Sequence, residues 1–269
     1  MIGVVSGLAV VTAGCQTPPP APNGTAPGGW TLEVTTPDIS VGAPQRFEVV
    51  LTQNQETATL PVVFGTVGLS FAYLGADGAD VPDPRRSVTA RYLPVPGTPA
   101  AGTGPVRSDP GAARGAYIAD DLLFDSVGVW SATATATLTG GGGPVRVSAT
   151  FPVVAAPAFP AVGQRAIPVD NPTIGSAVPA VQIDSRAGGG TPIPDPELHR
   201  WSVRAALAAH RAILLLFSTP AYCKSQVCGP STEEMARLAK RYADRAVFIH
   251  IEVWKKFSTA ALSTAATPW

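Results

Sequence analysis

The sequence predicts a two-domain protein, in which an antiparallel β-sandwich precedes a smaller α/β domain. Gly and Pro account for 27 and 28 of the 269 residues, and because both destabilise helices they argue against a mostly helical chain. Apolar and polar side chains alternate strictly in several stretches between residues 30 and 155, which is the pattern of half-buried strands. After a proline-rich segment, two apolar runs flank one amphipathic helical stretch, and this order is typical of an α/β unit.

The composition excludes several classes of protein. The chain carries 19 basic and 19 acidic side chains, so its net charge is zero, and we expect no nucleic-acid partner because a neutral chain has no electrostatic attraction to one. Since 45% of the residues are hydrophobic and only 14% are charged, a self-repelling, disordered chain is also excluded. The three cysteines, Cys15, Cys223 and Cys228, are too few for a disulfide-dense scaffold.

Residues 1–14 form a short apolar run without charge. The run is too short to span a bilayer and has the length of the apolar part of a signal peptide. Residues 11–15 resemble a bacterial lipobox, in which small residues precede a cysteine that becomes lipid-modified. The resemblance implies a lipid anchor at Cys15 and an extracytoplasmic bacterial lipoprotein attached to the cell membrane; the alternative is an apolar strand with an incidental cysteine. Residues 15–29 are rich in Pro and Gly and are predicted to form a tether.

Residues 30–155 are predicted to form the sandwich from about seven short strands. The clearest alternation occurs in residues 30–35, 47–52, 130–138 and 145–153, and weaker candidates are 69–74, 88–93 and 117–119. Residues 140–143 are expected to form a hairpin loop and 94–114 a long loop. Residues 124–130 resemble the entry to an immunoglobulin-like strand, which implies that Trp130 lies in the core rather than on a ligand platform. We expect this domain to be a spacer or a binding module.

Eight prolines interrupt residues 156–197, and hydrophobic periodicity disappears there. This composition predicts an extended linker, with the second domain, residues 198–269, beginning near Asp195.

The second domain is predicted to contain two helices and two strands. Residues 202–210 form a short helix capped by Ser202, and 212–217 form an apolar strand buried on both faces. A second helix runs from a capping box of Ser231 and Glu234 to about residue 243, and 246–253 form the second strand. The result is a βαβ unit with its thiols at the carboxyl end of the first strand, where reactive groups gather in open α/β sheets. A local disulfide between the two thiols requires Cα atoms within about 6 Å.

The loop and its flanks fit the pattern Phe-x-Thr-Pro-x-Tyr-Cys-x4-Cys-Gly-Pro. The matching residues are Phe217, Thr219, Pro220, Tyr222, Cys223, Cys228, Gly229 and Pro230. On these residues, the segment 198–269 resembles the thioredoxin-like domain of extracytoplasmic bacterial proteins. The resemblance implies that Cys223 and Cys228 are a catalytic redox pair, supported by Pro220, Tyr222, Gly229, Pro230 and Ser231.

Two alignments with the thioredoxin motif remain open. In the first, Cys223 is the nucleophile. In the second, Cys228 is the nucleophile, Ser231 replaces the usual resolving cysteine, and Cys223 resolves from upstream. The adjacent helix N-terminus favours Cys228 as the more readily ionised thiol.

The sequence departs from the family at two places. Leu216 lies near the position of the buried acid of thioredoxins, and Glu252 on the next strand is a candidate substitute. The favoured interpretation, however, is that Glu252 is exposed or paired with Lys255 or Lys256. The family's cis-proline loop, hairpin and last helix would follow Val253, so we expect an incomplete domain whose two strands leave apolar surface and a sheet edge unpaired.

Three functions are compatible with these features. The leading hypothesis is a membrane-anchored thiol–disulfide oxidoreductase, whose partners are protein thiols or disulfides and which needs neither a cofactor nor a metal. The second is a non-enzymatic surface lipoprotein with a structural disulfide and a role in binding or assembly. The third is copper binding or delivery through Cys223, Cys228 and His250, because thiolates suit Cu(I).

Overall fold

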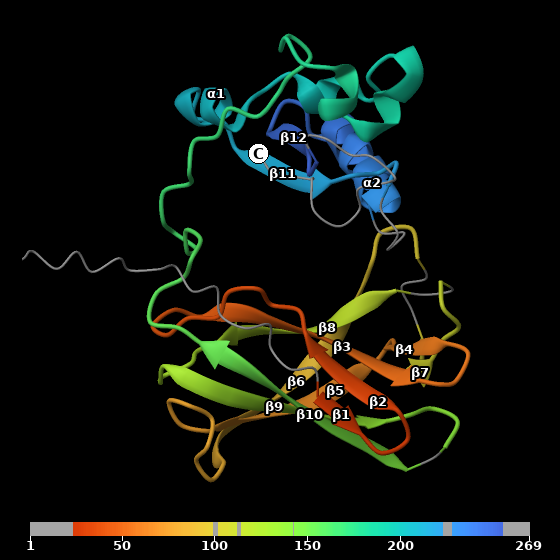
Figure 1. The fold of residues 1–269 in the computed structure, drawn as a ribbon, viewed down its shortest axis with the longest axis vertical. Coiled ribbons are helices and arrows are strands. Elements are labelled where there is room, and N and C mark those ends of the chain that lie inside the picture. Colours follow the sequence, from red (N-terminus) through yellow and green to blue (C-terminus); the bar gives the residue numbers. More distant parts are fainter. Residues whose placement is uncertain (1–23, 99–101, 112–113, 142, 223–227, 255–269) are drawn as a thin grey trace, which may run out of the picture.

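The computed structural model describes residues 24–98, 102–111, 114–141, 143–222 and 228–254. Figure 1 shows two bodies, a lower one built from strands and an upper one in which helices surround a small sheet. The chain passes from the lower body to the upper one after β10 (Pro144–Val153).

The lower body contains ten strands within these ranges. Besides β10 they are β1 (Gly24–Ala26), β2 (Trp30–Val34), β3 (Gln45–Asn54), β4 (Thr59–Val63), β5 (Thr66–Tyr73), β6 (Asp83–Pro94), β7 (Val106–Arg107), β8 (Gly115–Leu122) and β9 (Gly128–Thr137). Their order across the sheet is β1-β2-β3-β8-β6-β5-β9-β10, with β4 joining β3 to β7. Every pairing is antiparallel.

The sheet curls so far that its two end strands, β1 and β10, lie against each other. A Cβ atom added at Gly24 would overlap the carbonyl oxygen of Ser148 on β10, so this approach of two backbones requires glycine. The sheet is therefore nearly closed, which leaves few unpaired strand edges. The predicted all-β domain is confirmed at this level.

The core of the lower body is aromatic. The ring centroid of Phe47 lies 5.0 Å from those of Phe71 and Phe151, and Trp130 packs edge-on against Phe124 at 5.1 Å. Trp130 is 2% exposed, and its indole N–H donates to the carbonyl of Ser126. The prediction that Trp130 packs in the core is confirmed.

Three short strands correct the sequence-based predictions. β1 falls inside the predicted tether, because residues 24–26 form a hairpin with β2. β7 falls inside the predicted long loop, and β4, which was not predicted, pairs with it. Strands of two to five residues have too few alternating positions to produce a period, so no strand signal marks these three segments in the sequence.

The upper body is a βαβ unit with short helices packed around it. Its elements are the 3-10 helices η1 (Ala180–Gln182), η2 (Ser185–Gly190) and η3 (Pro196–His199), the helices α1 (Val203–Ala208) and α2 (Cys228–Arg241), and the strands β11 (Ile213–Ser218) and β12 (Val247–Glu252). β11 and β12 pair in parallel, from Ile213 opposite Val247 to Ser218 opposite Glu252. The predicted order of strand, helix and strand is confirmed, as is the Ser202 cap, whose hydroxyl accepts from the amide of Ala205.

The predicted boundary near Asp195 is wrong. Asn171 is 4% exposed, and its side chain accepts a hydrogen bond from the backbone amide of Val203 at the start of α1. Ile183 and Asp184 are buried as well. The second half of the predicted linker therefore belongs to the upper body, because its side chains complete the packing that a single βαβ unit leaves open.

Two details of the βαβ unit also differ from expectation. Leu214 and Phe217 of β11 are 44% and 63% exposed, so this strand is not buried on both faces. Helix α2 begins at Cys228, which places Ser231 inside the helix. Because Glu234 pairs with Arg237 instead of reaching back to the helix start, the predicted capping box is wrong.

Candidate functional site

The candidate site lies where β11 and β12 end and α2 begins. Cys228 is the first residue of α2, and it is disulfide-bonded and half-buried. The positive end of the helix dipole favours negative charge at this position, so a thiolate formed there on reduction is stabilised. Gly229 and Pro230 continue the first turn of the helix, where proline is tolerated because the missing N–H has no helical partner.

The other motif residues flank this position. Pro220 and Tyr222 lie in a turn directly after β11, and the Tyr222 amide donates to the carbonyl of Thr219. Cys223 lies outside the described residues, as do the lipid-attachment candidate Cys15 and the lysines Lys255 and Lys256. The structure thus brings Pro220, Tyr222, Cys228, Gly229 and Pro230 to one end of the βαβ unit.

Hydrogen bonds link the start of α2 to the end of β11. The hydroxyl of Thr232 donates to the carbonyl oxygen of Cys228 at 2.7 Å and lies 2.9 Å from the hydroxyl of Ser218. The Ser218 hydroxyl in turn lies 2.8 Å from Nε2 of His250 on β12. The side chains of Thr232, Ser218 and His250 are all buried. The backbone carbonyl of Cys228 is therefore hydrogen-bonded to a polar network that is shielded from water.

The network continues to a buried carboxylate. Oδ2 of Asp184 lies 3.3 Å from Nε2 of His199 and 3.5 Å from Nδ1 of His250, and all three side chains are fully buried. Arg186 holds the same carboxylate by two side-chain hydrogen bonds, of 3.0 and 2.7 Å, and one from its backbone amide at 2.9 Å. Arg186 also pairs with Asp195 at 3.0 Å.

These contacts determine the charge state of Asp184. Burial raises the pKa of this carboxyl, but hydrogen bonding, including the bonds from the side chain and backbone amide of Arg186, outweighs burial and holds the pKa well below its usual range. Hydrogen bonds from Asp184 likewise raise the pKa of Arg186. Asp184 is therefore a buried, ionised group whose charge is balanced locally.

Glu252 is a second buried acid, at the carboxyl end of β12. The side chain accepts a hydrogen bond of 2.8 Å from the amide of Ser185, and Glu252 is only 2% exposed. The hydroxyl of Ser185 accepts from the amide of Ala221 at 3.1 Å, in the turn before the cysteine loop. The favoured interpretation of Glu252 as an exposed acid is wrong, because its side chain is buried and bonds the amide of Ser185. Its role as a substitute acid stays a hypothesis.

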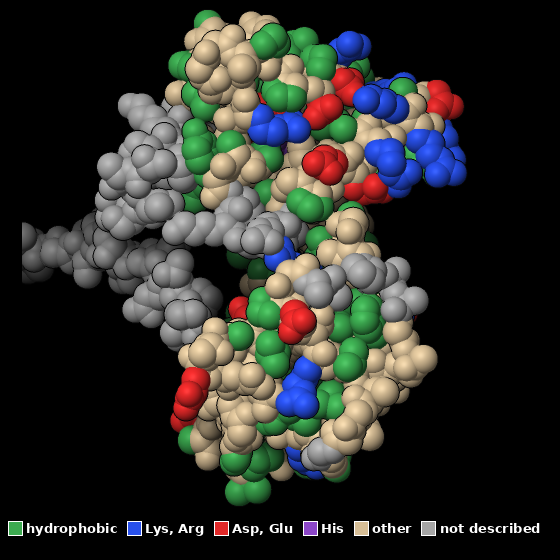
Figure 2. Space-filling view, turned by 90° about the vertical axis from the view of Figure 1, so that its right-hand side faces the viewer, with side chains coloured by type: hydrophobic (Ala, Val, Ile, Leu, Met, Phe, Trp, Pro, Cys, Tyr) green, Lys and Arg blue, Asp and Glu red, His purple; other side chains and the backbone are tan. Residues whose placement is uncertain are grey.

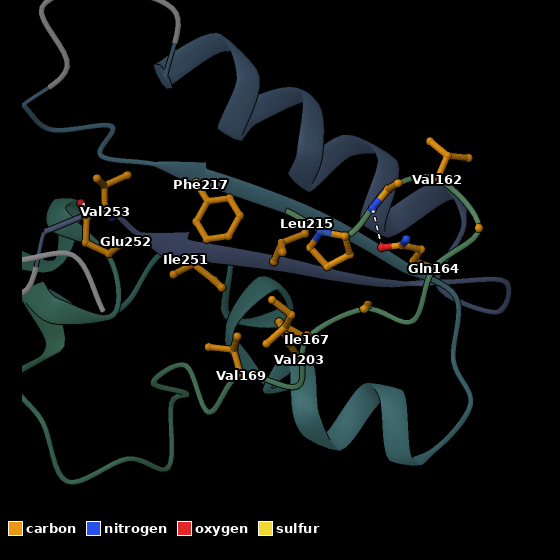
Figure 3. Close-up of a pocket in the computed structure, with 14 residues that line it drawn as sticks. Val162, Gln164, Ile167, Val169, Val203, Leu215, Phe217, Ile251, Glu252 and Val253 are labelled. Atoms are coloured by element: carbon orange, nitrogen blue, oxygen red, sulfur yellow. Dashed lines mark hydrogen bonds between the residues drawn. The ribbon is translucent and has the colours of Figure 1, made fainter. Parts of the chain in front are cut away.

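An apolar cavity of about 700 Å³ opens beside this end of the sheet. Figure 3 shows Leu215, Phe217 and Ile251 of the two strands facing Ile167, Val169 and Val203. Glu252 and Val253 line the cavity at the carboxyl end of β12. The expected apolar surface on these strands is thus present, in the form of a pocket that can accept apolar side chains.

Charged side chains are unevenly distributed on one face of the molecule. On the face shown in Figure 2, Lys, Arg, Asp and Glu side chains gather on the upper body, whereas the lower body shows few.

Among the residues that the structure describes, no helix is long and apolar enough to cross a membrane.

Sequence reasoning missed most of the buried network. Asp184 and Arg186 lie in the segment predicted to be a linker, where no periodicity marks a buried position. His199 and His250 are two of only three histidines in the chain. This scarcity was an available signal, but it does not show that the two side chains meet.

No known protein family, no curated protein and no solved structure significantly matches this chain.

Proposed function

We propose that the upper body catalyses thiol–disulfide exchange with other proteins through Cys228 and Cys223. The observation that carries the proposal is the disulfide-bonded Cys228 at the first residue of α2, the helix that connects β11 to β12 in a parallel βαβ unit. A cysteine at a helix N-terminus gains thiolate character on reduction, and the thiolate is the nucleophile in exchange.

The reaction proceeds in two balanced steps. A thiolate of the reduced pair attacks one sulfur of a partner disulfide, forms a mixed disulfide and releases the second partner sulfur as a thiolate. The other cysteine of the pair then attacks the mixed disulfide, so that the protein ends as a disulfide and the partner as a dithiol. Two electrons pass from the protein to the partner, and the reverse sequence oxidises a partner. Either cysteine is a candidate for the first attack.

The surroundings support this chemistry. Glu252 is a buried acid near the turn that leads into the cysteine loop, which is the environment expected of a group that exchanges protons with a leaving thiolate. The apolar cavity beside it suits the hydrophobic side chains of a partner polypeptide. The proposal includes a thioredoxin-like fold for the upper body and an immunoglobulin-like sandwich for the lower one.

The proposed location is the outer side of the cell membrane, with Cys15 as the lipid attachment site. The small residues before Cys15 support this assignment, and an oxidising compartment is where a disulfide such as that of Cys228 persists. Metabolic labelling with a fatty acid tests it. Label should enter the wild-type protein and be absent from Cys15→Ser, and equal labelling of both proteins would refute the anchor.

An exchange assay tests the activity. With dithiothreitol as the electron donor, the full chain should accelerate reduction of a disulfide-bonded model protein, and Cys228→Ser should lower the rate to that of dithiothreitol alone. Cys15→Ser is the matched control, because it removes a thiol at the other end of the chain and should leave the rate unchanged. Equal rates for wild type and Cys228→Ser would favour the structural-disulfide hypothesis instead.

A further inference from the structure

Asp184, His199 and His250 bring three metal-binding side chains together in the interior of the upper body. They come from three segments, since Asp184 precedes η2, His199 ends η3 and His250 lies on β12. One ligand-type atom from each lies within 4.8 Å of the other two, and each residue is at most 1% exposed. Nothing in the cysteine chemistry proposed above uses this cluster.

The hydrogen bonds around His250 fix which ring nitrogen carries its proton. The carbonyl of Cys228 can only accept, so the hydroxyl of Thr232 donates to it at 2.7 Å. The hydroxyl of Ser218, 2.9 Å away, must then donate to Thr232. The hydroxyl proton of Ser218 therefore points to Thr232 and cannot be donated to His250. The backbone carbonyl of Ser218 has no proton and can only accept.

It follows that Nε2 of His250 is the donor to Ser218. This nitrogen lies 2.8 Å from the Ser218 hydroxyl oxygen and 3.1 Å from the Ser218 carbonyl oxygen. In a neutral imidazole, the other nitrogen then carries a lone pair and no proton. That nitrogen, Nδ1, has no hydrogen-bond partner among the described residues and faces Oδ2 of Asp184 at 3.5 Å.

Two acceptor atoms that face each other in a dry interior require a cation between them. A metal ion meets this requirement, and the distances from Asp184 to the two histidines fit one. Two ligand atoms that each lie about 2.0 Å from a tetrahedral Zn²⁺ are separated by roughly 3.3 Å. Oδ2 of Asp184 lies 3.3 Å from Nε2 of His199 and 3.5 Å from Nδ1 of His250.

The second nitrogen of His250 also matches a metal ligand. A histidine bound to a metal usually donates its other N–H to a backbone carbonyl or a carboxylate, which holds the ring in place. His250 does this through Nε2 and the Ser218 carbonyl. Two carboxylates, those of Asp184 and Asp195, pair with the one guanidinium of Arg186, which donates to Oδ2 of Asp184 at 2.7 Å and leaves one negative charge in excess.

We propose that Asp184, His199 and His250 form a binding site for a divalent transition-metal ion, with Zn²⁺ the best match. The ligand atoms are Oδ2 of Asp184, Nε2 of His199 and Nδ1 of His250. Imidazole and carboxylate ligands suit Zn²⁺. This site shares only His250 with the thiol-based copper site considered above, and it needs neither cysteine.

Zinc binding by the untagged, oxidised full chain tests the proposal. After equilibrium dialysis against Zn²⁺, the wild type should hold one ion per chain, and His199→Asn should bind at least about 100-fold more weakly, because loss of a direct ligand exceeds the cost of losing an outer partner. His210→Asn is the matched control. His210 is the third histidine and is exposed, so its replacement should leave zinc affinity unchanged.

X-ray absorption of the zinc-loaded wild type provides a readout that does not depend on whether a variant folds. The expected spectrum shows only nitrogen and oxygen neighbours at about 2.0–2.2 Å, with imidazole scattering, and no sulfur at about 2.3 Å. Failure of the wild type to retain zinc, sulfur in the spectrum, or equal affinity in a folded His199→Asn would each overturn the proposal. In the first case, the cation between His250 and Asp184 would be a proton.

Discussion

Nδ1 of His250 lies 3.5 Å from Oδ2 of Asp184, although 66 positions separate the two residues in the sequence. The contact joins the proline-rich segment to β12, and neither side chain is exposed. The proline-rich segment is therefore part of the body that carries the cysteines, and its Asp184 is part of the polar network beneath them.

The first prediction concerns the buried charge of Asp184. Asp184→Asn should lower the free energy of unfolding of the metal-free protein by about 3–5 kcal/mol, because Arg186 then loses its buried counter-charge. Urea denaturation at neutral pH measures the change. Asp170→Asn is the control, since Asp170 and Arg204 form an exposed pair and the loss should stay below about 1 kcal/mol. Losses of the same size in both variants would contradict the account.

The second prediction concerns the hydroxyl of Thr232. Thr232→Val keeps the shape but removes the group that bonds both Ser218 and the carbonyl of Cys228, and it should cost about 1–3 kcal/mol in unfolding free energy. Thr232→Ser retains the hydroxyl and should recover the part due to hydrogen bonding. Chemical denaturation measures the unfolding free energy of the two variants. If Thr232→Val is as stable as Thr232→Ser, the hydrogen bonds of Thr232 contribute nothing to stability.

The third prediction separates the observed start of α2 from the expected one. Because Ser231 lies inside the helix, Ser231→Ala should leave stability unchanged or raise it by a few tenths of a kcal/mol. Ser202→Ala should cost about 1 kcal/mol, since Ser202 caps α1. Thermal unfolding of both variants is the measurement. If Ser231→Ala costs as much as Ser202→Ala, α2 begins at the capping box.

The fourth prediction concerns alkaline pH and the lower body. Burial raises the pKa of Tyr92 to about 12, and its hydroxyl has no hydrogen-bond partner among the described residues. Because the pKa is higher in the folded state than in the unfolded one, the stabilisation is complete below pH 10 and is lost as the pH rises toward 12. Tyr92→Phe should flatten this decline in unfolding free energy between pH 10 and 12. At neutral pH the variant should be as stable as the wild type or up to about 1 kcal/mol more stable, since it buries no unpaired hydroxyl. An unchanged slope would show that Tyr92 does not titrate in this range.

Strands with strict alternation were predictable because their burial follows a period of two. β10 is an example, with Val145, Val147, Ala149, Phe151 and Val153 all buried. The βαβ unit was predictable for a similar reason, since an apolar run, a helical pattern and a second run occur in order. Short strands such as β1 are held by their neighbours and have no period of their own.

The candidate site was predictable only where the sequence has a local pattern. Cys228 and its motif neighbours were found because they are close in the sequence. Asp184 was missed because its burial depends on β12 and η3, which meet it only in the folded chain. Glu252 was misjudged for the same reason, because the amide of Ser185, which comes from the predicted linker, supplies its partner.

The most direct test of the proposed exchange activity is a redox titration of the full chain in glutathione buffers, with thiol trapping and mass measurement at each potential. The account predicts that the disulfide of Cys228 equilibrates reversibly in the folded protein, with a midpoint between about −270 and −120 mV, the range of thiol–disulfide oxidoreductases. A midpoint below about −300 mV, or reduction only on unfolding, would mark a structural disulfide and contradict the proposed activity.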